Sequence, residues 1–176
     1  ENPWRLDMAG FEPDGNRFFV RYNQRGHRVL RMSAIDGRTG EVRTLVEETP
    51  ETFVDYNSKG FARWLDPGKE LLWMSERSGF NHLYLVRADE KRFGDITPIT
   101  SGDWPVFQVD EVDAETRTIR FRAGGVYEDQ DPYHVHHGRV SIDTGEITWL
   151  TEGDGTHDLT FSPDGDLYLD RYSRVD

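Results

Sequence analysis

A turn motif that returns at a fixed spacing is the feature of this sequence that most restricts its fold. A glycine followed by an acidic and then an aliphatic residue occurs at Gly40, Gly94 and Gly145, so these glycines lie 54 and 51 positions apart. The turn Pro13-Asp14-Gly15 returns as Pro163-Asp164-Gly165, 150 positions later. A period of about 50 residues with four short strands in each repeat is typical of a β-propeller, in which each repeat forms one blade.

The first repeat has the alternation of short strands and turns that is expected of one blade. Met8 to Phe11, Arg17 to Asn23, Arg28 to Ile35 and Glu41 to Val46 have the composition of short strands, and each gap between them contains glycine with Asp, Asn or Gln. Residues of these types favour tight turns, so the segment predicts one four-stranded antiparallel sheet.

The whole chain, residues 1–176, is therefore predicted to be all-β, an incomplete propeller of about three and a half four-stranded antiparallel blades. The expected blades span about residues 8–48, 62–100 and 106–151, and residues 158–176 supply the first two strands of a fourth. A β-sandwich with the same number of strands is the alternative. An open arc leaves strand edges uncovered, so we expect the chain to associate with itself or its end blades to fray.

Composition excludes several classes of function. The net charge of −12 argues against a nucleic-acid partner, which requires clustered Lys and Arg. There is no cysteine, hence no disulfide and no cysteine nucleophile or ligand. No apolar run reaches membrane-spanning length, and the start at Glu1-Asn2-Pro3 has neither an initiator Met nor a signal-peptide pattern, so we expect a piece of a longer protein.

Two groups of side chains have the composition of chemical sites. His134 and His136 would share one face of a strand, as in a two-histidine metal site completed by Asp129 or Asp131, but no third ligand is fixed by the spacing, so we expect no metal and no cofactor. The acidic residues Asp110, Glu111, Asp113 and Glu115 are interpreted as a solvated turn rather than as an acid–base pair.

The central hairpin offers structural rather than catalytic residues. We expect a ring nitrogen of His82 to bind the backbone or Glu76, and we expect Glu76 and Arg77 to pair with each other. Ser75 and Ser162 have no local triad signature with His82 or His157. The aromatic side chains are predicted to form the core between blades: Trp64, Trp73, Trp104, Trp149, Phe19 and Phe121.

Four segments carry a resemblance to a known family. They are Trp73 to Leu85 (WMSERSGFNHLYL), Ile99 to Trp104 (ITSGDW), Phe161 to Gly165 (FSPDG) and Asp170 to Ser173 (DRYS). Together they closely resemble the N-terminal propeller domain of the dipeptidyl peptidase IV family, in the prolyl oligopeptidase clan of serine peptidases. The resemblance runs from about Trp4 to Asp176.

The resemblance implies a scaffold rather than a catalytic domain. In that family a Ser-Asp-His triad lies in a C-terminal α/β-hydrolase domain, with the serine on a G-x-S-x-G turn, and this chain contains no such turn, so no catalytic residue is expected in it. The family's pair of glutamates that holds the substrate's amino terminus has no match here, since Glu47-Glu48 lies at a strand end before Pro50. The segment Phe53 to Phe61 matches a family loop that lines the substrate pocket, which makes Tyr56 and Asn57 the predicted substrate-binding residues.

Three functional hypotheses follow. The leading one is the non-catalytic propeller portion of a dipeptidyl-peptidase-IV-like serine peptidase, which gates and positions short peptides for its own C-terminal hydrolase domain. The alternative is a propeller that binds proteins or peptides without an associated enzyme, because a fold does not fix a function. The third is a self-contained hydrolase that uses an unrecognised acidic site.

Overall fold

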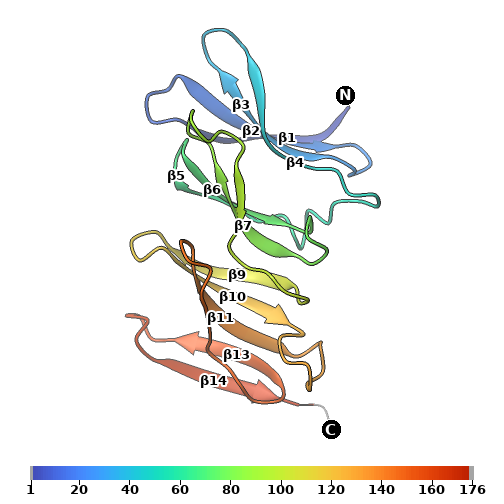
Figure 1. Cartoon of the computed structure of the whole chain (residues 1–176), viewed down its shortest axis with the longest axis vertical. Coiled ribbons are helices and arrows are strands. Elements are labelled where there is room, and N and C mark those ends of the chain that lie inside the picture. The colour runs from blue at the N-terminus through green and yellow to red at the C-terminus, as the bar shows by residue number, and fades with distance from the viewer. Residues whose placement is uncertain (1, 175–176) are drawn as a thin grey trace. The chain divides into compact units, whose positions relative to one another are not determined.

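In the computed structural model, which describes residues 2–174, the described chain contains strands and no helix (Figure 1). The strands form four antiparallel sheets, three with four strands and one with two, and within each sheet neighbouring strands follow one another in the sequence. This arrangement confirms the predicted fold class, an all-β incomplete propeller of about three and a half blades.

The first two sheets contain the first eight strands. The first sheet holds β1 (Pro3–Phe11), β2 (Arg17–Gln24), β3 (Leu30–Asp36) and β4 (Val42–Glu48). The second holds β5 (Ala62–Asp66), β6 (Glu70–Ser75), β7 (His82–Arg87) and β8 (Ile96–Pro98).

The remaining strands form the last two sheets. The third sheet holds β9 (Val106–Asp113), β10 (Thr118–Gly124), β11 (Val135–Ser141) and β12 (Ile147–Trp149). The fourth holds β13 (Thr156–Phe161) and β14 (Tyr168–Ser173). The expected partial blade extended to residue 176, and its last two residues lie outside the described part of the chain.

The first strand is longer than its apolar run suggested, since β1 begins at Pro3 and not at Met8. Its extra residues pair along β2, with Arg5 opposite Asn23 and Asp7 opposite Arg21. A proline is tolerated at the first position of a strand because no ladder hydrogen bond is needed from its nitrogen there. Backbone pairing therefore extends beyond the segment that the side-chain pattern marks.

The repeated glycines explain the period of the sequence. Gly40, Gly94 and Gly145 have φ angles of +74°, +88° and +71°, and each lies two residues before the last strand of its sheet. Residues that carry a side chain rarely adopt these φ angles, because their Cβ would be too close to the backbone, whereas glycine has no Cβ. The same turn chemistry is therefore needed once in every complete blade.

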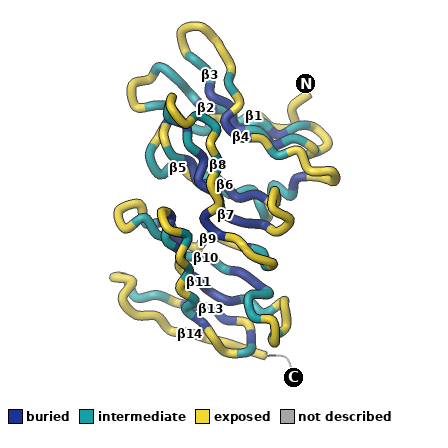
Figure 2. The backbone as a smooth tube through the Cα atoms, viewed as in Figure 1, coloured by how far each residue is buried: buried dark blue, intermediate teal, exposed yellow. Residues whose placement is uncertain are grey.

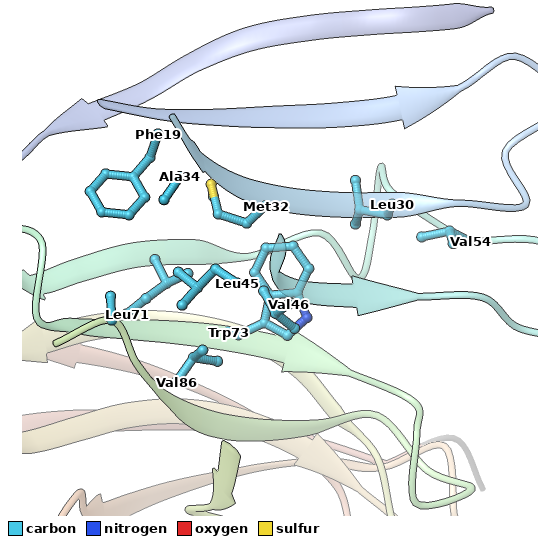
Figure 3. Close-up of a cluster of buried hydrophobic side chains, with 11 residues drawn as sticks. Phe19, Leu30, Met32, Ala34, Leu45, Val46, Val54, Leu71, Trp73 and Val86 are labelled. Carbon is cyan, nitrogen blue, oxygen red and sulfur yellow. The ribbon is translucent and has the colours of Figure 1, made fainter. Parts of the chain in front are cut away.

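The chain divides into two compact units, residues 1–77 with 83–98 and residues 78–82 with 99–176. In the first unit a buried cluster lies between the first and second sheets, with Met32 and Leu45 from one side and Leu71 and Trp73 from the other (Figure 3). Trp64 supports this cluster, since its Nε1 donates to the carbonyl of Ala9 at 2.8 Å. Figure 2 shows the buried stretches along β3, β6 and β7.

The second unit has an aromatic core of its own. Trp104 stacks on Phe121 with ring centroids 6.0 Å apart, and Trp149 meets both rings edge-on. These contacts join β10, β12 and the segment before β9 of one sheet, whereas the predicted packing between blades is met by Phe19 and Trp64, whose rings lie 4.5 Å apart on the first and second sheets. Within residues 2–174, no helix is long and apolar enough to cross a membrane.

Candidate functional site

Residues 49–61, which connect β4 to β5, border two cavities of the first unit. The larger cavity, of about 420 Å³, is formed by the end of β4, the connector and the end of β6, including Glu48, Lys59 and Arg77. The smaller cavity, of about 210 Å³, contains both predicted substrate-binding residues. It is lined by Arg5, Asp7, Arg21, Asn23, Leu30, Tyr56 and Asn57.

Two carboxylates of the larger cavity, at the end of β4, are engaged with protein groups. Glu48 Oε1 accepts hydrogen bonds from Trp73 Nε1 at 2.8 Å and from Arg77 Nη2 at 2.5 Å. Glu47 pairs with Arg31. The Glu48 contacts hold the end of β4 against β6 and the turn that follows it, and the Glu47 contact holds it against β3, so both glutamates have structural partners.

The expected pairing of Glu76 with Arg77 is wrong. Glu76 Oε1 accepts a hydrogen bond from Lys59 Nζ at 2.5 Å, whereas Arg77 reaches across to Glu48. Arg77 also donates from Nε to Ser75 Oγ at 3.0 Å, which holds its side chain in that direction. Neighbours in sequence within a turn project in different directions, so each ion finds its partner on another segment.

The connector holds Tyr56 against the loop between β2 and β3. The Tyr56 ring lies 4.6 Å from the His27 ring, centroid to centroid, and the N–H of Val54 donates to the His27 carbonyl at 2.7 Å. His27 itself has a φ of +55°, and its Nδ1 donates to Asn23 Oδ1 at 3.2 Å. A hairpin loop of one strand pair therefore positions the predicted contact residue of the next connection.

Asn57 lies in a tight turn that follows Tyr56. Asp55 forms this turn, because its Oδ1 accepts from Ser58 N at 3.2 Å and its carbonyl accepts from Lys59 N at 2.9 Å. Aspartate commonly closes such turns by binding the backbone two or three residues on. The turn places the Asn57 side chain at the wall of the smaller cavity.

Gly60 lets the connector pass very close to Arg21. A Cβ at Gly60 would lie 2.4 Å from the Tyr56 carbonyl oxygen and 2.8 Å from Arg21 Nη2. Contacts this short leave no room for any side chain, so the residue after the turn has to be glycine. The guanidinium of Arg21 is thereby held between the connector and the Trp73 ring, whose centroid is 5.9 Å from its central carbon.

Arg21 was not among the predicted site residues, and it is the least satisfied charge of the cavity. Across residues 2–174 no carboxylate oxygen lies within 4 Å of its guanidinium, because Asp7, directly opposite on β1, pairs with Arg5 at 2.6 Å. Burial lowers the pKa of Arg21, an effect that Asp7 partly offsets. No signal in the sequence indicates this, since Arg17 in the same strand looks identical and is fully paired with Glu12 and Glu90.

His82 has the structural role that was expected, and of the two partners that were predicted it binds the backbone. Its Nε2 donates to the Gly102 carbonyl at 3.0 Å, which confirms a bond to the backbone, while Nδ1 accepts from Thr100 Oγ1 at 3.0 Å rather than binding Glu76. Burial lowers its pKa, so the ring is held neutral between these groups. His82 therefore fixes the loop that carries Gly102.

The two histidines of the candidate metal site do not act together. His134 precedes β11 instead of lying on it, with Nδ1 3.1 Å from Asp154 Oδ1, whereas the buried His136 binds Gln130 and Thr151. In the part of the chain that the structure describes, no group of three or more His, Asp or Glu is arranged to hold a metal ion. The expectation of a shared strand face is wrong because the strand begins one residue later.

Three of the four residues of the acidic stretch, Asp110, Glu111 and Asp113, lie on a strand, β9, and not in a turn. Asp110 and Glu111 lie on β9, where they pair with Arg122 and Arg120 of the adjacent β10. Only Asp113 closes a turn, by accepting from Thr116. Cross-strand arginines that the local pattern does not reveal thus pair with Asp110 and Glu111.

The serines with a nearby histidine in the sequence are engaged in turns. Ser75 accepts from Arg77, and Ser162 Oγ donates to Asp164 Oδ1 at 2.6 Å. Neither is hydrogen-bonded to a histidine in the described residues. Their hydrogen bonds stabilise the turns in which they lie.

Comparison with solved structures shows the fold of this chain in larger proteins. A protein from Bacteroides ovatus assigned as a dipeptidyl aminopeptidase IV superposes with a TM-score of 0.66 at 21% identity, over 96% of this chain and 26% of its own length. Dipeptidyl peptidase 4 of Porphyromonas gingivalis superposes with a TM-score of 0.66 at 24% identity, over 90% of this chain and 21% of its own. The chain thus spans about a quarter or less of the proteins that it resembles.

The sequence itself matches a family model along almost its whole length. The match covers residues 4–176 and is to the family described as the dipeptidyl peptidase IV (DPP IV) N-terminal region. It includes all four sheets and the connector with Tyr56 and Asn57. The chain therefore belongs to the DPP IV N-terminal region family.

Proposed function

We propose that this chain is the non-catalytic propeller portion of a dipeptidyl-peptidase-IV-like serine peptidase, which gates and positions short peptides for a C-terminal α/β-hydrolase domain. The observation that carries the proposal is the family match over residues 4–176. We further propose the blade division of the sequence, at about 8–48, 62–100, 106–151 and 158–176, as the domain organisation of this portion.

The smaller cavity supports a role in peptide binding. Tyr56 offers an aromatic ring with a hydroxyl group and Asn57 offers an amide, and both line one pocket of about 210 Å³. Ligand pockets typically combine apolar walls with a few placed polar groups, and Leu30 supplies the apolar wall here. A propeller that carries such a pocket selects by size as well, because only short or unfolded peptides pass a rigid cover.

The first experiment is to read the coding sequence that follows Asp176 in its source and to assay the protein it encodes. A G-x-S-x-G turn followed by Asp and then His, together with release of dipeptides from a chromogenic Xaa-Pro substrate, is the expected result. The absence of this arrangement would contradict the peptidase proposal and favour the alternative of a peptide-binding propeller without an enzyme.

Two variants of that protein test whether the connector, residues 49–61, contributes to substrate binding. Tyr56→Ala and Asn57→Ala are each expected to raise KM by about three- to tenfold with little change in kcat, since uniform binding is lost. Tyr133→Ala is the matched control, because that side chain is 85% exposed and lies outside both cavities. An unchanged KM in both connector variants would remove Tyr56 and Asn57 from the proposed binding site.

We also infer that the 176-residue chain by itself pairs with a second copy through β14. This strand pairs with β13 on one side, and on the other it has no partner strand among the described residues. Leu167 and Leu169 are 73% and 70% exposed. Exposed edges of this kind pair readily with an identical edge. Light scattering should show a concentration-dependent dimer that Leu169→Lys dissociates, and a monomer at every concentration would refute the inference.

A further inference from the structure

The surroundings of Arg21 are basic in a protein that is strongly acidic. The cavity of Tyr56 and Asn57 and a neighbouring one of about 360 Å³ share Arg5, Asp7 and Arg21, and the neighbour adds Arg63. These linings therefore hold three arginines and one aspartate, although the chain carries a net charge of −12. A local reversal of charge in a concave site concentrates ions of the opposite sign.

Arg21 differs from the other inward arginine of its strand. Arg17 forms two hydrogen bonds with Glu12, at 2.9 and 2.6 Å, and a third with Glu90 at 2.5 Å. Arg21 is partly buried and has no carboxylate partner across residues 2–174. A guanidinium cannot lose its proton at physiological pH, so the cost of removing it from water remains until an anion binds it.

Neutral donors lie around the same cavity. Asn23 is 5% exposed, and its Oδ1 is occupied by His27, which leaves the amide nitrogen as the donor of that side chain. The Tyr56 hydroxyl and the Asn57 amide complete the polar lining. These groups can donate to an oxygen that Arg21 holds.

We propose that the Arg21 cavity binds a carboxylate group of the peptide ligand, with the Arg21 guanidinium as its principal partner. The proposal rests on the proposed function, since it takes Tyr56 and Asn57 as peptide contacts. A carboxylate matches the planar fork of a guanidinium through two parallel hydrogen bonds. The volume of about 210 Å³ accommodates an acidic side chain, which makes peptides with Asp or Glu the substrate class.

The test is a titration of the ¹⁵N-labelled 176-residue chain, at low ionic strength and pH 7, followed through the arginine Nε–H signals. The probe is N-acetyl-glutamic acid α-amide, and N-acetyl-glutamine α-amide is its uncharged counterpart. We expect the acid probe to shift the Arg21 signal and the Tyr56 and Asn57 amide signals in a saturable way. The glutamine probe should shift them at least tenfold more weakly at equal concentration.

Two variants that each remove one positive charge test whether Arg21 itself binds the acid probe. Arg21→Gln should weaken binding of the acid probe at least tenfold, followed by the Tyr56 and Asn57 amides. Arg28→Gln, at an exposed arginine outside the cavities, should retain binding within twofold. If Arg21→Gln does not fold, Arg21→Lys replaces it, and loss of the fork at constant charge should still weaken binding at least threefold.

Equal shifts with the acid and the glutamine probes, or full affinity in the Arg21 variants, would overturn the proposal. The titration requires no catalysis, so its outcome is independent of the peptidase assay. Acid-selective binding in a protein whose gene lacks a hydrolase would keep the site and reject the proposed function. Peptidase activity without acid-selective binding would keep the proposed function and reject the carboxylate site.

Discussion

Removal of the Phe19 side chain tests whether the seam between the first two sheets holds the first unit together. Phe19 lies on β2 and is completely buried, and its ring packs against the Trp64 ring with centroids 4.5 Å apart. Phe19→Ala leaves a cavity that the surrounding strands, tied together by ladders of hydrogen bonds, fill only in part. Such substitutions cost about 3–5 kcal/mol.

The expected loss of stability in Phe19→Ala sets the size of the change in the urea denaturation midpoint. Each 1.4 kcal/mol is about tenfold in an equilibrium constant, so the folding constant should fall by roughly two to three and a half orders of magnitude. With a urea slope of about 2 kcal/mol per molar, the denaturation midpoint should move down by about 1.5–2.5 M. Tryptophan fluorescence reports the transition, because Trp73 belongs to the buried cluster between the first two sheets and Trp64 packs against it.

Phe53→Ala is the matched control for Phe19→Ala. The Phe53 side chain is 61% exposed, so its loss should change the free energy of unfolding by no more than about 0.5 kcal/mol. Equal midpoint shifts for the two variants would refute the reasoning, since they would mean that burial between the sheets does not decide the stability of the first unit.

Two further predictions concern pH and the connector. Burial lowers the pKa of His82, and burial followed by the neighbouring His157 lowers that of His136. Below about pH 6.5 the unfolded chain therefore binds more protons than the folded chain. The free energy of unfolding should then fall on acidification, by up to about 1.4 kcal/mol per pH unit for each ring. A melting temperature that rises as the pH is lowered from 7.5 to 5.5 would contradict this. Gly60→Ala should destabilise the chain more than Gly40→Ala, because a Cβ at Gly60 meets the backbone, whereas at Gly40 it adds only the strain of a positive φ in open space; equal urea midpoints would show that the close approach costs no more than that strain.

The pattern of the sequence was a good guide to elements whose cause is local. The turn at Gly40 requires a positive φ, and strand residues alternate on either side of it, so the four-stranded unit and its repetition follow from short stretches. The same reasoning missed the beginning of β1, because pairing with β2 extends it past its apolar residues. It also placed Asp110 in a turn, because the arginine that pairs with it lies on another strand.

Some residues of the candidate site could likewise be predicted from the sequence and others could not. Tyr56 and Asn57 were predicted from the resemblance of their loop, which is a property of the sequence. No sequence pattern distinguishes Arg21 from Arg17, two arginines of one strand.

The sequence by itself determined the fold class, since turn chemistry and strand alternation act between residues that are close in the chain. Only the tertiary structure decided which charges are satisfied. Arg17 meets Glu90 from 73 positions away, whereas the one carboxylate opposite Arg21, that of Asp7, is taken by Arg5. Ion pairs form between whatever groups folding brings within a few ångströms, so an arginine left without a partner becomes visible only when the sheets are packed.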